Sequence, residues 1–167
     1  MSGALILTAR FDERAQDYFQ AMRDAHFPSE MNIVPAHLTL FHKLPGEEHE
    51  AIVEALQEVT AEAAPLSARV ADVRFFGRGG AFVVRCEGLD TLRAGLAKRW
   101  SAWLTEQDRQ PHRPHVTYQN KVTKERAKTT YEAVLREFGA FEAEVIGLDL
   151  WWYRRHWDEA GTFGFGG

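Results

Sequence analysis

The sequence predicts an α+β fold with mainly antiparallel sheets, built from two related halves. A tetrapeptide of histidine, an apolar residue, threonine and an apolar residue occurs at 37–40 and again at 115–118, each time after a proline. Strand-like runs alternate with helix-like stripes, and one pair of runs forms a hairpin. Hairpins mixed with helices are typical of α+β proteins. With 167 residues, of which 45% are hydrophobic, we expect one domain over 1–167 made of two interleaved lobes.

In the first half, a buried strand precedes an amphipathic helix, and the strand with the first tetrapeptide precedes a second helix. Asp12 is a suitable N-cap for the first helix, because its side chain can accept from a backbone amide of the first turn. Prolines and a glycine mark the ends of the following elements. The expected elements are a strand at 4–9, a helix between 12 and 28, a strand from the tetrapeptide to 45, and a helix at 47–64.

A hairpin follows, and after it the order of helix, tetrapeptide strand and helix occurs again before a last strand. The glycine-rich sequence 77–80 predicts the hairpin turn, since it lacks the spacing of a phosphate-binding loop. Thr123 is a suitable cap for the last helix, and Gly139 a suitable end. The expected elements are strands at 66–76 and 81–86, a helix from 90 to 104, a surface loop at 108–114, the second tetrapeptide strand, a helix from 123 to 139, a strand at 141–153 and a tail at 154–167 that forms an edge strand or frays.

Composition points to a cytoplasmic protein. The single cysteine, Cys86, permits no intramolecular disulfide and follows an apolar run, so we expect it to be packed rather than reactive. No apolar run approaches the ~20 residues that span a membrane, and charged residues come too early for a signal peptide. The formal net charge of −4 disfavours non-specific duplex binding. We expect a monomer without a membrane partner.

Strand alternation places the histidine and threonine of each tetrapeptide on one face. His37 and Thr39 then share a face, as do His115 and Thr117, while the apolar residues point the other way. Two such strands would line one groove. Histidine changes its charge near neutral pH, and a facing pair can act as acid and base in a single displacement. The threonine hydroxyls are placed to donate to phosphate oxygens, where negative charge develops.

Four further residues near the tetrapeptides are candidates for substrate binding. Lys43 and Lys121 each follow a motif histidine by six positions, which by ideal alternation is the same face. Phe41 shares that face and either stacks on a nucleobase or packs in the cleft wall. Arg113 precedes the second motif and faces either phosphate or solvent.

The two tetrapeptides resemble the paired His-x-Thr/Ser-x signatures of the 2H phosphoesterase superfamily, which includes 2′-5′ RNA ligase and cyclic phosphodiesterase proteins. The resemblance implies a bilobal α+β fold with the motifs facing across a central cleft. It implies metal-independent activity, without a cofactor, on 2′,3′-cyclic phosphates or 2′-5′ linkages of RNA ends or small nucleotides. Carried over by position, the catalytic residues are His37, Thr39, His115 and Thr117. Many members have an arginine soon after the second motif, where this chain has residues 119–121, Gln-Asn-Lys.

Other interpretations remain open from sequence alone. A non-catalytic RNA- or nucleotide-binding module would keep the same cleft, and histidines on half-buried strands are often structural. A zinc site would use His112 and His115, three positions apart, with His42, but no cysteine or carboxylate stands at ligand spacing. His42 has the opposite parity to His37 and is expected to be a partly buried strand histidine. In ring opening we expect His37 as the acid and His115 as the base.

Overall fold

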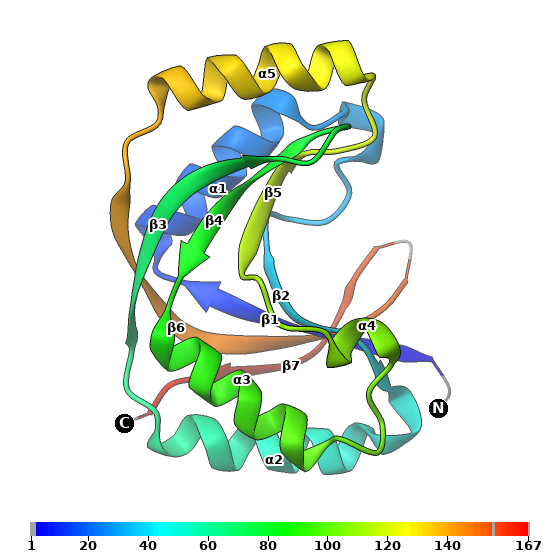
Figure 1. Ribbon diagram of the computed structural model, residues 1–167. Helices are drawn as coiled ribbons and strands as arrows, with labels where there is room; N and C mark the ends of the chain where they lie inside the picture. Colours follow the sequence, from blue (N-terminus) through cyan, green and yellow to red (C-terminus); the bar gives the residue numbers. More distant parts are fainter. Residues whose placement is uncertain (1–2, 155, 167) are drawn as a thin grey trace.

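The computed structural model describes residues 3–154 and 156–166, and its elements follow the predicted order (Figure 1). The first half contains β1 (Ala4–Phe11), α1 (Glu13–His26), β2 (Leu38–Pro45), α2 (His49–Glu62) and β3 (Leu66–Phe75). The second half contains β4 (Gly80–Arg85), α3 (Glu87–Arg99), α4 (Glu106–Arg109), β5 (His115–Gln119), α5 (Lys124–Glu137), β6 (Phe141–Trp152) and β7 (Asp158–Gly164). Short 3-10 helices cover Ser29–Met31 and Gly46–Glu48.

The strands form one antiparallel sheet in the order β2-β1-β6-β3-β4-β5, with β7 also paired to β6. The third strand of each half lies beside the first strand of the other half, since β3 pairs with β4 and β6 pairs with β1. The two third strands, β3 and β6, also pair with each other and so join the halves. The two groups, β2-β1-β6 and β5-β4-β3, therefore mirror each other. The sheet curves so that its ends, β2 and β5, come into contact with each other. The expected bilobal α+β fold is confirmed.

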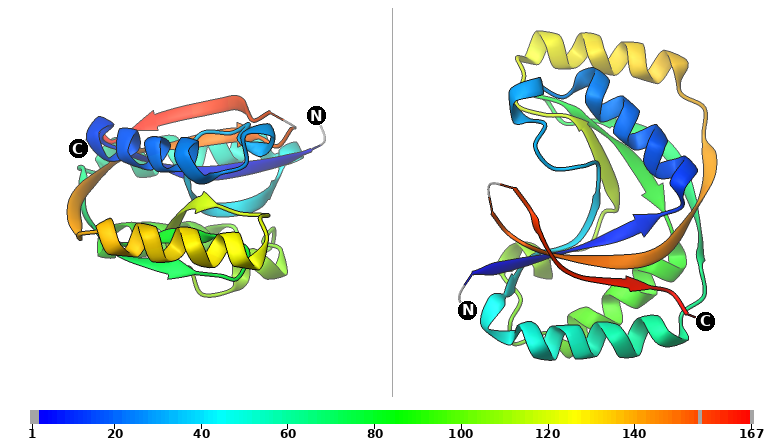
Figure 2. Two further views of the ribbon diagram at one scale, coloured as in Figure 1. Left: turned by 90° about the horizontal axis from the view of Figure 1, so that it is seen from above. Right: turned by 180° about the vertical axis from the view of Figure 1, so that it is seen from behind.

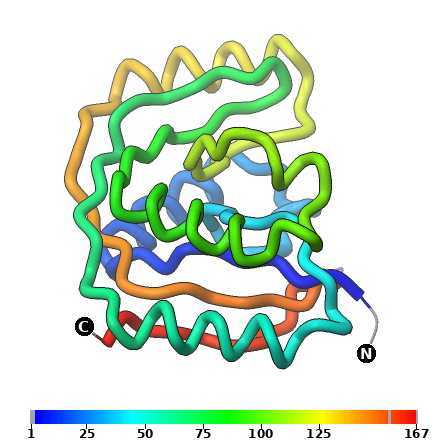
Figure 3. The backbone as a smooth tube through the Cα atoms, turned by 60° about the horizontal axis from the view of Figure 1, so that its bottom comes forward, coloured from blue at the N-terminus to red at the C-terminus, as the bar shows by residue number. Residues whose placement is uncertain are grey.

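The helices cover opposite ends of this curved sheet. α1 and α5 lie at one end and α2 and α3 at the other (Figure 1). Figure 3 shows α2 and α3 running on the same side, where Arg99 and Glu58 form an ion pair of 2.8 Å. Neither of these helices, nor any other in the described ranges, is long and apolar enough to cross a membrane.

The predicted helix caps are present. Asp12 accepts a hydrogen bond of 3.3 Å from the amide of Ala15, and Thr123 accepts one of 3.2 Å from the amide of Arg126. Each bond satisfies a first-turn amide that has no partner within the helix. The N-terminal ends of α1 and α5 are thus defined by local sequence.

The hairpin turn before β4 requires glycine for space. A Cβ on Gly79 would lie 1.8 Å from the carbonyl oxygen of Gln119, and one on Gly80 would lie 2.2 Å from the Tyr118 hydroxyl. Gly77 has φ +93°, which side chains rarely adopt. The turn therefore packs directly against β5. This agrees with the expected hairpin turn.

Two parts of the chain have more regular structure than the sequence indicated. The short helix α4 includes the first two residues of the expected surface loop at 108–114, and the tail forms the edge strand β7, one of its two expected outcomes. Cys86 is 2% exposed within the continuous apolar core, as expected for a packing residue. The β6–β7 hairpin extends beyond the sheet beside β2 (Figures 1 and 2).

Candidate active site

The two motif histidines lie where the facing end strands of the sheet begin. His115 is the first residue of β5, and His37 immediately precedes β2. The Nδ1–H of His37 donates to the carbonyl of Pro35 at 2.8 Å, and the Nδ1–H of His115 donates to the carbonyl of Arg113 at 2.7 Å. A carbonyl oxygen only accepts, so Nδ1 carries the proton in both neutral rings. Nε2 of each ring is left for a ligand.

Both histidines and both threonines of the tetrapeptides line one cavity of about 670 Å³. Its walls come from β1, β2, α4, β5 and the β6–β7 hairpin. The other lining residues are Ala4, Ile6, His42, Lys43, Gln107, Tyr153 and Trp157. A cavity of this size accommodates a nucleotide-sized ligand. The geometry thus brings together the four residues that the sequence singled out.

The expectation for Phe41 is wrong. Its side chain is 0% exposed and packs edge-on against Trp100 at a ring distance of 5.3 Å, with the Arg93 guanidinium 4.5 Å from its centroid. The cause is irregular pairing between β1 and β2. Thr8 pairs with Thr39, yet Leu7 pairs with Phe41, so one residue of β2 is extra. A bulge of this kind reverses the faces of the residues that follow.

The same bulge turns His42 into the cavity, against the sequence expectation. His42 and Lys43 are both exposed, whereas the two residues before them are buried. Asp108, whose side chain is 1% exposed, accepts from the His42 Nδ1–H at 3.0 Å and from the backbone amides of His42 and Lys43 at 2.9–3.0 Å. Alternation alone could not reveal this arrangement, because the carboxylate that fixes it lies 66 positions away.

The remaining substrate-binding candidates separate into two groups. Lys43 lines the cavity, and Arg113 lines two neighbouring cavities with His115. Lys121 is exposed at a left-handed turn with φ 64° before α5 and is not among the residues that line these cavities. The matching six-residue spacing therefore does not give the two lysines matching positions.

Aromatic side chains near His37 come from the β6–β7 hairpin. The Trp157 ring lies 4.5 Å from the His37 ring, and Tyr153 is 61% exposed at the cavity. Trp151 faces the same side and donates to the Thr8 hydroxyl at 2.9 Å, while Trp152 stacks near His49 on the other side. No pattern in the sequence singled out Trp157 or Tyr153 as residues of the site.

Burial makes His37 a weak base for a histidine. Removal from water lowers the pKa of His37 from 6.5 to about 4, against a smaller opposing effect of its hydrogen bond to Pro35. The nearby charges of Arg23, His115 and His42 lower the pKa further. His37 is therefore neutral at pH 7, with an unprotonated Nε2.

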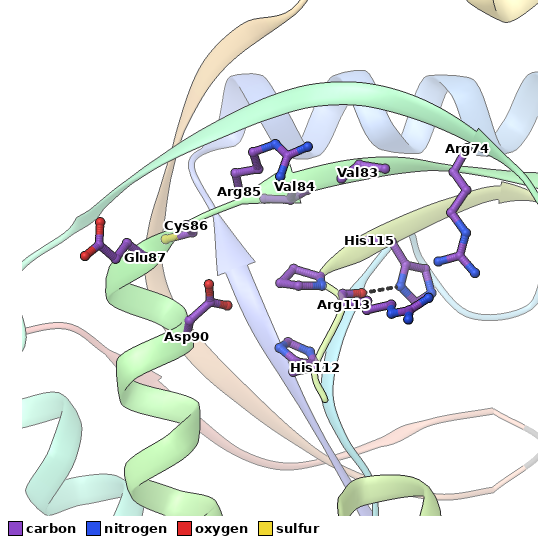
Figure 4. Close-up of a pocket in the computed structure, with 11 residues that line it drawn as sticks. Arg74, Val83, Val84, Arg85, Cys86, Glu87, Asp90, His112, Arg113 and His115 are labelled. Atoms are coloured by element: carbon purple, nitrogen blue, oxygen red, sulfur yellow. Dashed lines mark hydrogen bonds between the residues drawn. The ribbon is translucent and has the colours of Figure 1, made fainter. Parts of the chain in front are cut away.

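Two arginines lie near His115 on the side away from the main cavity. Figure 4 shows Arg74 reaching from β3 and Arg113 from the loop before β5, with the His115 ring between them. They line cavities of about 510 and 320 Å³ that adjoin the main cavity at His115. Two positive side chains therefore stand near His115, while Glu87 and Asp90 line the far part of the larger cavity (Figure 4).

His112 is a structural link rather than a metal ligand. Its Nε2–H donates to the carbonyl of Thr39 at 2.8 Å and so ties the loop before β5 to β2. Burial lowers the pKa of His112, which keeps the ring neutral. No group of three or more histidine, cysteine or acidic side chains in the described part of the chain is arranged to hold a metal ion.

Comparison with known proteins agrees with the geometry. Residues 11–157 match the family model of the 2′-5′ RNA ligase superfamily. A search of curated protein sequences gave no match. Among solved structures, TT0787 of Thermus thermophilus is similar with 18% identity and a TM-score of 0.67 over 98% of each chain. E. coli LigT, crystallised with NADP+, is similar with 16% identity and a TM-score of 0.61 over 100% of each chain.

A third solved structure, described as a phosphoesterase, is similar with 15% identity and a TM-score of 0.63 over 100% of each chain. All three structures share the fold of this chain. The resemblance drawn from the two tetrapeptides is thereby confirmed at the level of the family. The chain belongs to the 2′-5′ RNA ligase superfamily, a group of 2H phosphoesterases.

Proposed function

We propose that the protein is a metal-independent phosphoesterase that opens 2′,3′-cyclic phosphates, or cleaves and joins 2′-5′ linkages, of RNA ends or nucleotides. The observation that carries this proposal is the matched pair of imidazoles. Both are held at Nδ1 by the carbonyl two residues earlier, and both line one cavity. An acid and a base on opposite sides of a phosphorus atom are the two groups that an in-line displacement requires.

In the proposed ring opening, His37 is the base. Its unprotonated Nε2 removes a proton from water as the water oxygen bonds to phosphorus. His115, in its charged form, gives its Nε2 proton to the ribose oxygen as the phosphorus–oxygen bond breaks. The products are a phosphate monoester and a free hydroxyl, and the two rings regain their starting states by proton exchange with solvent. The low pKa of His37 favours this assignment over the opposite one expected from sequence.

In the proposed mechanism, the two threonines stabilise the negative charge on the phosphate oxygens. Thr39 and Thr117 lie two positions beyond their histidines and line the same cavity. Their hydroxyls donate to the non-bridging oxygens, on which charge builds in the transition state. Each acid or base contributes about 10²–10⁴-fold to the rate, which together suits a strained cyclic ester.

Hydrolysis of a nucleoside 2′,3′-cyclic phosphate in the presence of EDTA tests the proposal. Turnover is expected in the wild-type protein and is expected to be lost in His37→Ala and His115→Ala. His49→Ala is a matched control, because His49 contacts Ala160 and Trp152 away from the cavity. Tight binding without turnover would instead support a nucleotide-binding module.

A further inference from the structure

The cavity contains a third imidazole, His42, held in a different way from the motif histidines. His37 and His115 are tied to carbonyl groups, whereas the Nδ1–H of His42 donates to the carboxylate of Asp108. The His42 side chain is 42% exposed and Asp108 is 1% exposed. Nε2 of His42 is thus the exposed end of a carboxylate-backed imidazole.

β2 is irregular at the position where His42 contacts Asp108. Two register shifts separate Thr39 from Leu44, since Thr8 pairs with Thr39 and Leu5 with Leu44. The extra length leaves the amides of His42 and Lys43 pointing at Asp108, which accepts from both. Bulges re-aim side chains beside functional sites.

Asp108 is itself held from two further elements. The hydroxyl of Thr105 caps α4 by accepting from the Asp108 amide at 3.3 Å. Arg93, which is 8% exposed, donates from Nη2 to the Asp108 carbonyl at 2.7 Å and from Nε to the Leu40 carbonyl at 3.1 Å. The carboxylate, the bulge and α3 therefore form one connected polar network.

The buried carboxylate stays charged. Burial opposes its ionisation, but the hydrogen bonds from the His42 ring and from the amides of His42 and Lys43 prevail and lower the pKa of Asp108 below its ordinary 3.8. A ring held at Nδ1 by a carboxylate can carry a second proton at Nε2 when an anionic phosphate oxygen lies against it. In that state Nε2 donates a charge-assisted hydrogen bond, which suits a phosphate oxygen.

We infer that His42, positioned by Asp108, is a third substrate contact that binds a non-bridging oxygen of the phosphate held between His37 and His115. This inference rests on the proposed function for the identity of the ligand. It assigns three imidazoles different tasks: two move protons, and the third holds phosphate charge. Asp108 is a positioning residue, because its carboxylate is 1% exposed, holds the His42 ring and does not line the 670 Å³ cavity.

Titration calorimetry of the full chain with adenosine 2′-phosphate and with adenosine tests this assignment. His42→Gln removes the imidazole donor from a partly exposed position and is expected to weaken phosphate binding roughly 10- to 100-fold, the range for a hydrogen bond to a charged group. Adenosine binding is expected to stay unchanged. Asp108→Asn should raise the Kd of the nucleotide more than that of the nucleoside, and His49→Gln should change neither.

In the wild-type protein, the Nε2 resonance of His42 is expected to shift on addition of adenosine 2′-phosphate, a measurement that needs no variant. Equal nucleotide affinity in the wild type and His42→Gln overturns the inference, as does equal weakening for nucleotide and nucleoside. A wild-type protein without measurable phosphate affinity overturns it too.

The two proposals fail separately. If the protein binds phosphate through His42 but never opens a cyclic phosphate, the proposed reaction is wrong and the proposed His42 contact is supported. An active protein whose phosphate affinity is independent of His42 would refute the site alone.

Discussion

The two halves of the molecule place equivalent histidines in unequal surroundings. His37 and His115 have the same Nδ1 hydrogen bond to the carbonyl two residues before, at 2.8 and 2.7 Å. Beyond that bond, the surroundings differ. His37 is packed against Trp157 and followed by an irregular strand, whereas His115 begins a short strand between two arginines.

The shared bond and the different surroundings have separate consequences. The shared bond fixes the same tautomer in both rings and exposes the same nitrogen, which a duplicated motif would provide. The surroundings distinguish the two rings, because burial lowers the pKa of His37 to about 4. In the proposed mechanism, duplication therefore accounts for where the two histidines stand, and local packing accounts for which of them accepts the proton.

The largest expected effect comes from removing either member of the pair. His37→Ala or His115→Ala should each lower kcat/KM for a cyclic phosphate by about 10²–10⁴-fold, or roughly 3–5 kcal/mol of transition-state stabilisation. The double variant should lose less than the product of the two losses, since both groups act in one step. Steady-state kinetics of the three variants measures this. Losses that multiply fully would show that the two rings act in different steps.

The buried carboxylate that supports the first half should contribute far more to stability than an exposed acidic group. Asp108→Asn is expected to lower the free energy of unfolding by about 2–4 kcal/mol, because one buried acceptor and its charge are lost. Glu142→Gln is a matched comparison, since Glu142 is 70% exposed in its ion pair with Arg69. That variant should change stability by less than about 0.5 kcal/mol. Urea denaturation of both measures the difference, and similar losses would contradict it.

Stability should also depend on pH through His37. The unfolded chain binds a proton near pH 6.5 and the folded protein only near pH 4, so the folded state is penalised as pH falls between these values. The expected loss attributable to this ring is up to about 3 kcal/mol. Unfolding free energies of His37→Gln and the wild type from pH 7 to 4 isolate the effect. Parallel curves for the two proteins would show that His37 does not carry the shifted pKa.

The arginines beside His115 should act through charge, with a smaller effect. If Arg113 contacts one phosphate of a single-stranded oligonucleotide, Arg113→Ala should reduce the slope of log K against log salt by about 0.7. Lys121→Ala should leave the slope unchanged, because Lys121 lies outside the cavities that Arg113 lines. Binding isotherms at several salt concentrations measure both variants. Equal slope changes would point to a diffuse charge effect.

The sequence predicted the parts of the fold and site that depend on local patterns. The order of elements, the caps Asp12 and Thr123, and the shared faces of the two tetrapeptides follow from periodicity and hydrogen-bonding chemistry within a few residues. The convergence of the two tetrapeptides followed from their repetition, since related halves tend to place related strands alike.

The errors in the site arise where distant residues change local geometry. Phe41 is buried and His42 faces the cavity because β2 bulges around Asp108, whose position depends on the packing of α4. Trp157 reaches His37 only because β6 and β7 form a hairpin beside β2. Neither arrangement has a periodic signal in the sequence.

Ring-nitrogen NMR of the histidines, with and without adenosine 2′-phosphate, tests most directly whether two imidazoles serve one phosphorus atom. We expect a protonated Nδ1 in His37 and His115, an unprotonated Nε2 in free His37 at pH 7, and a change at Nε2 of both rings with one equivalent of nucleotide. A nucleotide that perturbs only one ring, or either ring found in the opposite tautomer, would contradict it.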